Sequence, residues 1–219
     1  MSGLEWLMWL RGPGLKWALV IFLAGLVYRV IRIISSGKSR DLSVPRQPYL
    51  MQGLLCIVRR SIFHPGMTHR GYFTLISGYT FHIGLLLAVF FLQQHILVFK
   101  SILHVSWPAL PPFAVDVATL VSITALFAIL IHRILDPVVR ALTNYQDILA
   151  WILTVLPLLT GFALMHPMGI SYTAAMVLHL ASVEMLLVVI PFTKLTHMVT
   201  LFVSRWYNGA LGGYRGVKT

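Results

Sequence analysis

The stretch YFTLISGYTFHIGLLLAVFFLQQHILVF, residues 72–99, contains no Asp, Glu, Lys or Arg. A helix needs about 20 predominantly apolar residues to cross the hydrocarbon core of a bilayer. This stretch is long enough and apolar enough to do so, and it carries two histidines, His82 and His95. It predicts a membrane-spanning helix that places ionisable side chains inside the membrane.

The composition of the whole chain agrees with this interpretation. The 219 residues are 58% hydrophobic and 11% charged, with a mean hydropathy of +0.84, whereas a soluble domain carries roughly a quarter charged residues. We therefore expect an all-α integral membrane protein with a single membrane domain, residues 1–219. A soluble enzyme, a nucleic-acid-binding domain and a disulfide-stapled module are excluded. With Cys56 as its single cysteine, the chain by itself is not expected to bind an iron–sulfur cluster.

Four further segments have the length and composition of membrane spans. They cover about residues 15–34, 113–131, 148–165 and 171–197, the last extending into the cytoplasm to about residue 205. The final two are separated at His166–Gly169, because Pro and Gly there mark a turn. Together with 72–99, the pattern predicts a bundle of five transmembrane helices.

The distribution of Lys and Arg predicts the orientation of the bundle. The formal charge is +11, from 17 Lys and Arg against 6 Asp and Glu. Basic residues concentrate between the first two spans, between the third and fourth, and at the C-terminal end. Because cytoplasmic loops collect Lys and Arg, we expect the N-terminus outside and the C-terminus in the cytoplasm. Within the first of these loops, residues 48–63 have the apolar spacing of a short helix lying on the membrane surface.

Four histidines lie on only two of the predicted helices. His179 and His197 are 18 residues apart, which is five full turns at about 100° per residue and about 27 Å along an ideal helix. They would share one face at two membrane depths. The preceding His-bearing helix runs the opposite way, so His82 should lie level with His197, and His95 level with His179.

Two facing imidazoles at each of two depths are the ligands of two six-coordinate haems b. With both axial positions filled by nitrogen, such iron is suited to electron transfer. Zinc is less favoured because thiolates and further ligands are missing. His82 and His95 are offset by about 220° on an ideal helix, so we expect a kink or a π-bulge between them. The alternative is one haem, with His95 facing elsewhere and His179 merely hydrogen-bonded.

Two short motifs resemble a known family. Phe81-His82-Ile83-Gly84 and the run PFTKLTHM, residues 191–198, are similar to segments of the gamma subunit of respiratory nitrate reductases. Related subunits serve sulfite-reductase-associated and heterodisulfide-reductase-like membrane complexes. The resemblance extends from the first span to about Trp206. It implies a dihaem cytochrome b of the inner membrane of a prokaryote.

The resemblance also implies roles for the histidines. His82 and His197 would ligate the inner haem, and His179 the outer haem. In the family the partner of His179 lies ten residues after the first histidine; here that position is Leu92, and His95 is the nearest substitute. Electrons would pass between membrane quinol or quinone and a cytoplasmic iron–sulfur subunit, and through it a catalytic subunit. The terminal acceptor and the direction of flow stay open.

Several other polar residues have two possible roles. Lys194, Arg29 and Arg32 could each contact a haem propionate or extend to lipid headgroups. Lys100, just beyond the second span, is the candidate for a quinol-oxidation site. Glu184, an acidic residue in the middle of a span, could relay protons or form a hydrogen bond inside the bundle.

Two other functions compete with the redox subunit. A transporter or proton channel could use the intramembrane histidines, although neither an inverted repeat nor a pair of broken helices is visible. A membrane anchor without haem could hold a cytoplasmic enzyme.

Overall fold

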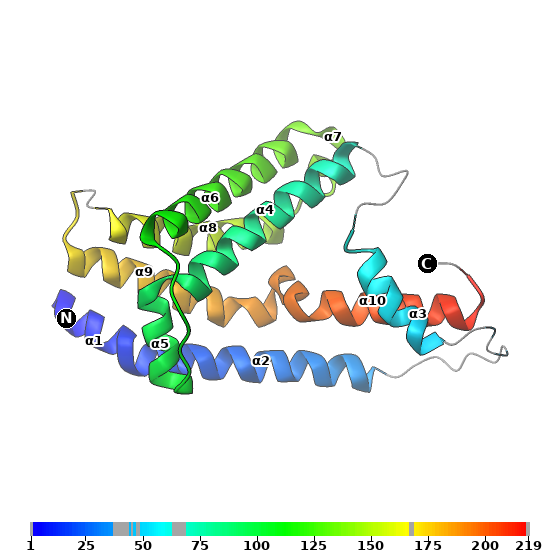
Figure 1. Cartoon of the computed structure of the whole chain (residues 1–219), viewed down its shortest axis with the longest axis horizontal. Coiled ribbons are helices and arrows are strands. Elements are labelled where there is room, and N and C mark those ends of the chain that lie inside the picture. The colour runs from blue at the N-terminus through cyan, green and yellow to red at the C-terminus, as the bar shows by residue number, and fades with distance from the viewer. Residues whose placement is uncertain are drawn as a thin grey trace. The chain divides into compact units, whose positions relative to one another are not determined.

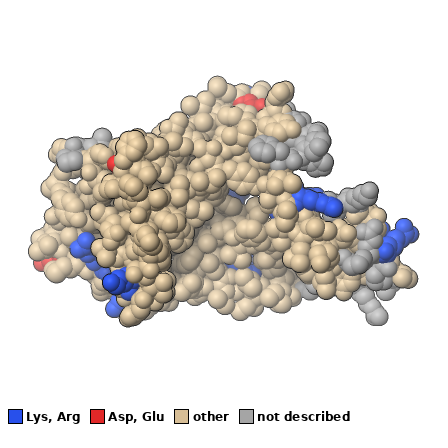
Figure 2. All heavy atoms as spheres, in the orientation of Figure 1, with Lys and Arg blue, Asp and Glu red and all other residues tan. Residues whose placement is uncertain are grey.

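A computed structural model describes residues 2–36, 44, 46, 49–62, 69–166 and 169–217. Every regular element within these residues is a helix. Five helices among them are long and apolar enough to cross a membrane: Gly3–Ser35, Gly71–Phe91, Pro112–Leu135, Tyr145–Met165 and Tyr172–Phe192. The predictions of an all-helical chain and of five membrane-length helices are confirmed, and the chain is a multi-pass membrane protein. Charged side chains cover little of the face in Figure 2.

The chain divides into two compact units, which are described separately. The first unit comprises Met1–Trp17 and Arg70–Leu186, and the second comprises Ala18–His69 and Leu187–Thr219. The outer pair of predicted ligands, His95 and His179, lies within the first unit. The motif that leads to His197 lies within the second.

The N-terminal helix is longer than the predicted span 15–34. It begins with α1 (Gly3–Trp9), continues through the π-helical segment η1 (Leu10–Gly14) and ends with α2 (Leu15–Ser35). Its start is fixed by a capping box, in which the Ser2 hydroxyl accepts from the Glu5 amide and the Glu5 carboxylate accepts from the Ser2 amide. Such reciprocal bonds satisfy free amides of a first turn.

Helices α4 (His69–Phe91), α6 (Pro112–Leu135) and α8 (Tyr145–Met165) form the core of the first unit. The short α7 (Pro137–Ala141) connects the last two. The buried cluster consists of Phe81, Ala125, Leu126, Val155 and Leu158. Buried polar atoms are paired across the core: the Ser122 hydroxyl donates to the carbonyl of Phe81, at 3.1 Å, and the Trp151 indole donates to that of Leu126, at 2.8 Å.

The membrane-spanning helix predicted over 72–99 ends earlier than predicted. Helix α4 ends at Phe91, Leu92 is extended with φ −74° and ψ 129°, and a separate helix, α5 (Gln93–Leu103), follows. Figure 1 shows α5 turned sharply away from the line of α4. Segment 105–111 then returns to the end of α4. There the Trp107 indole donates to the Phe90 carbonyl at 2.6 Å, and the Leu110 amide donates to the Phe91 carbonyl at 3.1 Å.

The helix predicted over 171–197 is interrupted in the structure. Helix α9 (Tyr172–Val189) gives way to two 3-10 turns, η2 (Ile190–Phe192) and η3 (Lys194–Thr196), before α10 (His197–Tyr214) begins. Pro191 cannot donate a helical hydrogen bond, and Thr193 between the turns is extended, with φ −122° and ψ −176°. The count of five ideal turns between His179 and His197 therefore does not apply.

In the second unit, α3 (Tyr49–Arg59) packs closely against α10. The contact is close because glycines occupy it: a Cβ at Gly53 would lie 2.7 Å from the Trp206 indole, and one at Gly213 would lie 2.7 Å from Gln52. Helix α3 lies within the predicted segment 48–63, whose two end residues are outside the described part of the chain. Its apolar side chains Leu50, Met51, Leu54 and Val58 are exposed.

Candidate metal centre

The break after α4 brings His95 to His179. His95 lies in the first turn of α5 and His179 near the middle of α9, and both rings are partly buried. The ring centroids are 6.1 Å apart and the ring planes differ by only 16°. The predicted departure from ideal helix geometry between His82 and His95 is confirmed, although it is an extended residue and not a π-bulge.

The hydrogen bond of His95 fixes which of its nitrogens is available. Its Nδ1 lies 3.0 Å from the carbonyl of Ala88, in the last turn of α4. Because a carbonyl can only accept, Nδ1 carries the hydrogen and Nε2 keeps its lone pair in the neutral ring. The last carbonyls of a helix lack donors within that helix. The end of α4 therefore orients the imidazole so that Nε2 is the nitrogen with the free lone pair.

The ring of His179 is fixed by α8 in the same manner. Its Nδ1 lies 3.2 Å from the Thr160 hydroxyl, which itself donates to the Leu156 carbonyl at 2.8 Å. Oγ1 of Thr160 can then accept from Nδ1, which again leaves Nε2 available. The ring lies directly on the α8 backbone, since a Cβ at Gly161 would be 3.0 Å from Cε1 of His179.

The distance between the ring centroids can be compared with the distance expected for two imidazoles on one shared metal ion. Metal–nitrogen bonds of about 2 Å on both sides, and about 1 Å from each nitrogen to its ring centre, place the centroids roughly 6 Å apart. Within the described residues, no three or more His, Cys, Asp or Glu side chains come together around a metal position.

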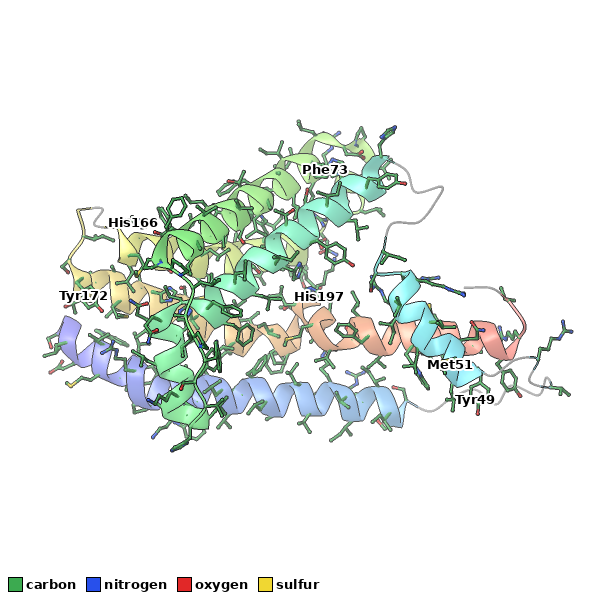
Figure 3. All side chains as sticks on the ribbon, viewed as in Figure 1. Tyr49, Met51, Phe73, His166, Tyr172 and His197 are labelled. Carbon is green, nitrogen blue, oxygen red and sulfur yellow. The ribbon has the colours of Figure 1, made fainter. Side chains whose placement is uncertain are left out.

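In the predicted inner pair, Nδ1 of each ring also lies within hydrogen-bond distance of a backbone carbonyl. Nδ1 of His82 lies 2.7 Å from the carbonyl of Gly78, and Nδ1 of His197 lies 3.0 Å from that of Lys194. Both side chains are exposed, and Figure 3 labels His197 at the start of α10. His82 belongs to the first unit and His197 to the second. The pairing of these two side chains stays a prediction.

The four predicted basic residues differ in their surroundings. Nε of Arg29 donates to the carbonyl of Pro191 at 2.8 Å, within the second unit. Arg32 is exposed in the last turn of α2, and Lys194 is exposed at the start of η3. Lys100 is exposed in the last turn of α5. Arg29 thus supplies a hydrogen-bond donor to the broken fifth helix, a role that the sequence did not predict.

Sequence reasoning missed the two groups that orient the outer pair of histidines, the Thr160 hydroxyl and the Ala88 carbonyl. Thr160 and Ala88 orient the outer pair, and a threonine in the middle of an apolar span was the visible signal for the first of them. His166, labelled in Figure 3, lies just past the end of α8 with its Nε2 3.5 Å from the Asp116 carboxylate. The ring of His132 contacts that of Phe73 at a centroid distance of 4.5 Å, with the two planes tilted by 45°.

Comparison with known proteins places the chain in a family. It is 33% identical over 214 residues to a protein of Nitratidesulfovibrio vulgaris (strain Hildenborough), an alignment that covers 95% of this chain and 93% of that protein. The chain belongs to the same family as this relative, whose name carries no statement of function. No protein-family model matches the chain, and no solved structure shows a significant match.

Proposed function

We propose that this chain is the cytochrome b membrane subunit of a respiratory or sulfur-metabolism oxidoreductase complex. It would carry two haems b and connect the membrane quinone pool with a cytoplasmic iron–sulfur subunit. The observation that carries the proposal is the pair His95 and His179, with parallel rings 6.1 Å apart and both Nδ1 atoms engaged elsewhere. The motif resemblance around His82 and His197 supports a second haem.

In this proposal the histidines ligate the haem iron, and neighbouring groups hold each imidazole ring in its orientation. A haem b held by two imidazoles supplies one-electron transfer and leaves no open position on the iron. Ala88 and Thr160 hold the outer imidazoles in the tautomer that presents Nε2, as outer partners of metal-bound histidines commonly do. Gly78 and Lys194 provide carbonyls for His82 and His197 in the same way.

The expected orientation of the chain would put the two pairs towards opposite sides of the membrane. The loop between the first two helices carries Lys38, Arg40, Arg46, Arg59, Arg60 and Arg70, which favours its placement in the cytoplasm. His95 and His179 then lie towards the outer surface of a prokaryotic inner membrane. Lys100, exposed five residues after His95, is the side chain available to a quinol head group on that side.

The cytoplasmic partner is expected to dock beside α3 and α10. This region exposes Arg59 and Arg60 next to apolar side chains of α3, and Arg205 is tied to Ser61 by a 2.6 Å hydrogen bond. Truncating the chain after Arg205 would remove the glycines that pack α10 on α3, so it would not isolate docking. Arg59→Glu with Arg60→Glu should instead weaken co-purification of the partner while the haem content is unchanged.

A visible spectrum tests the proposal directly. The purified chain should show reduced-minus-oxidised bands of low-spin haem b, with two haems per chain. His179→Ala should lose one haem, while His104→Ala, at an exposed position after α5, should keep both. A chain without haem bands would contradict the proposal. Proton flux into vesicles that contain such a chain would then favour a proton channel, and its absence would favour a membrane anchor.

A further inference from the structure

Glu184 is a buried carboxyl group in the middle of a membrane span. Its residue is only 8% exposed in α9. Its Oε1 is buried and has no hydrogen-bond partner among the residues that the structure describes. Buried polar atoms are nearly always paired, so an orphaned carboxyl oxygen requires a physical explanation.

The other oxygen of Glu184 lies against the π-helical segment η1. A Cβ at Gly14 would be 2.7 Å from Oε2, and equally close to the ring of Trp9. The contact lies within the first unit, and Gly14 is itself buried. Pro13, inside η1, removes one backbone donor from the same turn. Single π-helical turns inside longer helices frequently occur at functional sites.

The charged groups of the two contacting helices do not neutralise this carboxyl in the described structure. The N-terminal helix carries Glu5, Arg11, Lys16, Arg29 and Arg32, and α9 carries His179. No ion pair joins any of them to Glu184 in the described residues, and both Arg11 and Lys16 are exposed. A carboxylate in this environment is costly unless a cation compensates it. The simplest cation is a proton, bound covalently to the orphaned oxygen.

We infer that Glu184 is a proton-binding site inside the membrane, closed on one side by η1, which binds a proton from water and returns it. The reaction is the reversible formation of one O–H bond between a carboxylate and a proton, so no oxidant or reductant is required. The site goes beyond the proposed haem function and does not depend on it.

Infrared spectroscopy of the whole chain in vesicles tests the site. The chain contains two glutamates, Glu5 and Glu184, so glutamate labelled with carbon-13 at the side-chain carboxyl isolates their signals. The labelled carbonyl band of a protonated carboxyl should persist in Glu5→Gln, disappear in Glu184→Gln and shift when the medium is exchanged for D2O. A band that survives in Glu184→Gln, or that is insensitive to D2O, would overturn the inference.

Two alanine variants test the contact with η1. Gly14→Ala places a methyl group against Oε2 and should shift the band and the pH at which half of the signal is lost. Gly12→Ala is the matched control, because a Cβ there meets nothing within 4 Å. Equal spectra for Gly14→Ala and Gly12→Ala would contradict the role of η1. The haem content has no part in these readouts, so a chain without haem would overturn only the proposed function.

Discussion

Two predicted transmembrane helices are broken, and the breaks differ in how they are made. The break at Leu92 is one extended residue between two α-helices. The break at Pro191 is two 3-10 turns on either side of an extended Thr193. The first has no Pro or Gly near it in the sequence, whereas the second contains the proline that helix interiors exclude.

Both breaks satisfy freed backbone carbonyls with donors from distant segments. At the first, the Trp107 indole and the Leu110 amide donate to the end of α4. At the second, the Arg29 guanidinium on α2 donates to the Pro191 carbonyl. In a membrane, irregular backbone is tolerated where protein groups satisfy it. Each break is followed within a few residues by a candidate ligand, His95 or His197. The backbone at each break therefore sets the position of one histidine.

The largest expected effect is the loss of one haem when the histidine that follows either break is replaced. His95→Ala should remove one haem of two and block quinol oxidation, whereas the haem held by His82 and His197 remains. His197→Ala should remove the other haem and leave the chain inserted in the membrane. Loss of one axial nitrogen releases a bis-imidazole haem, so the haem-to-chain ratio and the low-spin spectrum measure both effects.

The two variants also check each other. Distinct spectra for the haems retained in His95→Ala and His197→Ala would support two separate sites. An unchanged haem count in His95→Ala would exclude His95 as a ligand and leave its ring as a cap on the end of α4. Two retained haems in His197→Ala would contradict the inner assignment.

The sequence predicted the class of fold because that class depends on composition and on apolar run length. Five spans were visible from such runs and from the turn after Met165. The break at Leu92 was not, because leucine and glutamine favour helix and the donors that satisfy it lie at Trp107 and Leu110. Only tertiary contacts decide against a helix there. Pro191 marks the second break in the sequence, whereas the Arg29 donor to its carbonyl lies on α2, far away in the chain.

The sequence predicted which histidines belong to the candidate site but not the tertiary contacts that bring them together. His95 and His179 could be named from the number of intramembrane histidines and from a resemblance. The 13-residue spacing between His82 and His95 showed that the helix must depart from ideal geometry for His95 to reach His179. It did not show where the helix breaks or what conformation the break has. Thr160, which orients His179, lies on a third helix, and no local pattern connects it to a histidine 19 residues later.

Gly25 tests how closely α2 must approach the second break. A Cβ at this position would lie 2.5 Å from Cβ of Pro191, and a proline ring cannot rotate away. Overpacking of this kind costs about 3 kcal/mol, so Gly25→Ala should lower the free energy of unfolding by about that amount in a denaturant titration in micelles. Gly78→Ala, where a Cβ meets nothing within 4 Å, should be neutral or slightly stabilising. Equal stabilities of the two variants would refute the close approach.

Arg29 tests the donor at the same break. Arg29→Met keeps much of the side-chain length but leaves the Pro191 carbonyl without its guanidinium donor. An unsatisfied buried acceptor costs about 2 kcal/mol, and the unfolding titration should show a loss of that size. Arg32→Met, at an exposed position one turn away, is the matched control and should change stability by less. A loss equal in both variants would indicate interaction with lipid headgroups and not with Pro191.

Trp107 tests the first break, where we expect the smallest effect. Trp107→Phe removes the indole donor to Phe90 but keeps an aromatic ring beside Phe99, whose centroid lies 5.5 Å away. The Leu110 amide still serves the neighbouring carbonyl, and water at the membrane surface can replace a partly exposed donor. The loss should therefore be about 1 kcal/mol, below that of Arg29→Met. Trp17→Phe, at a side chain 65% exposed, should have no measurable effect. A larger loss for Trp107→Phe than for Arg29→Met would show that the break at Leu92 depends on one donor more than the break at Pro191 does, and would reverse their ranking.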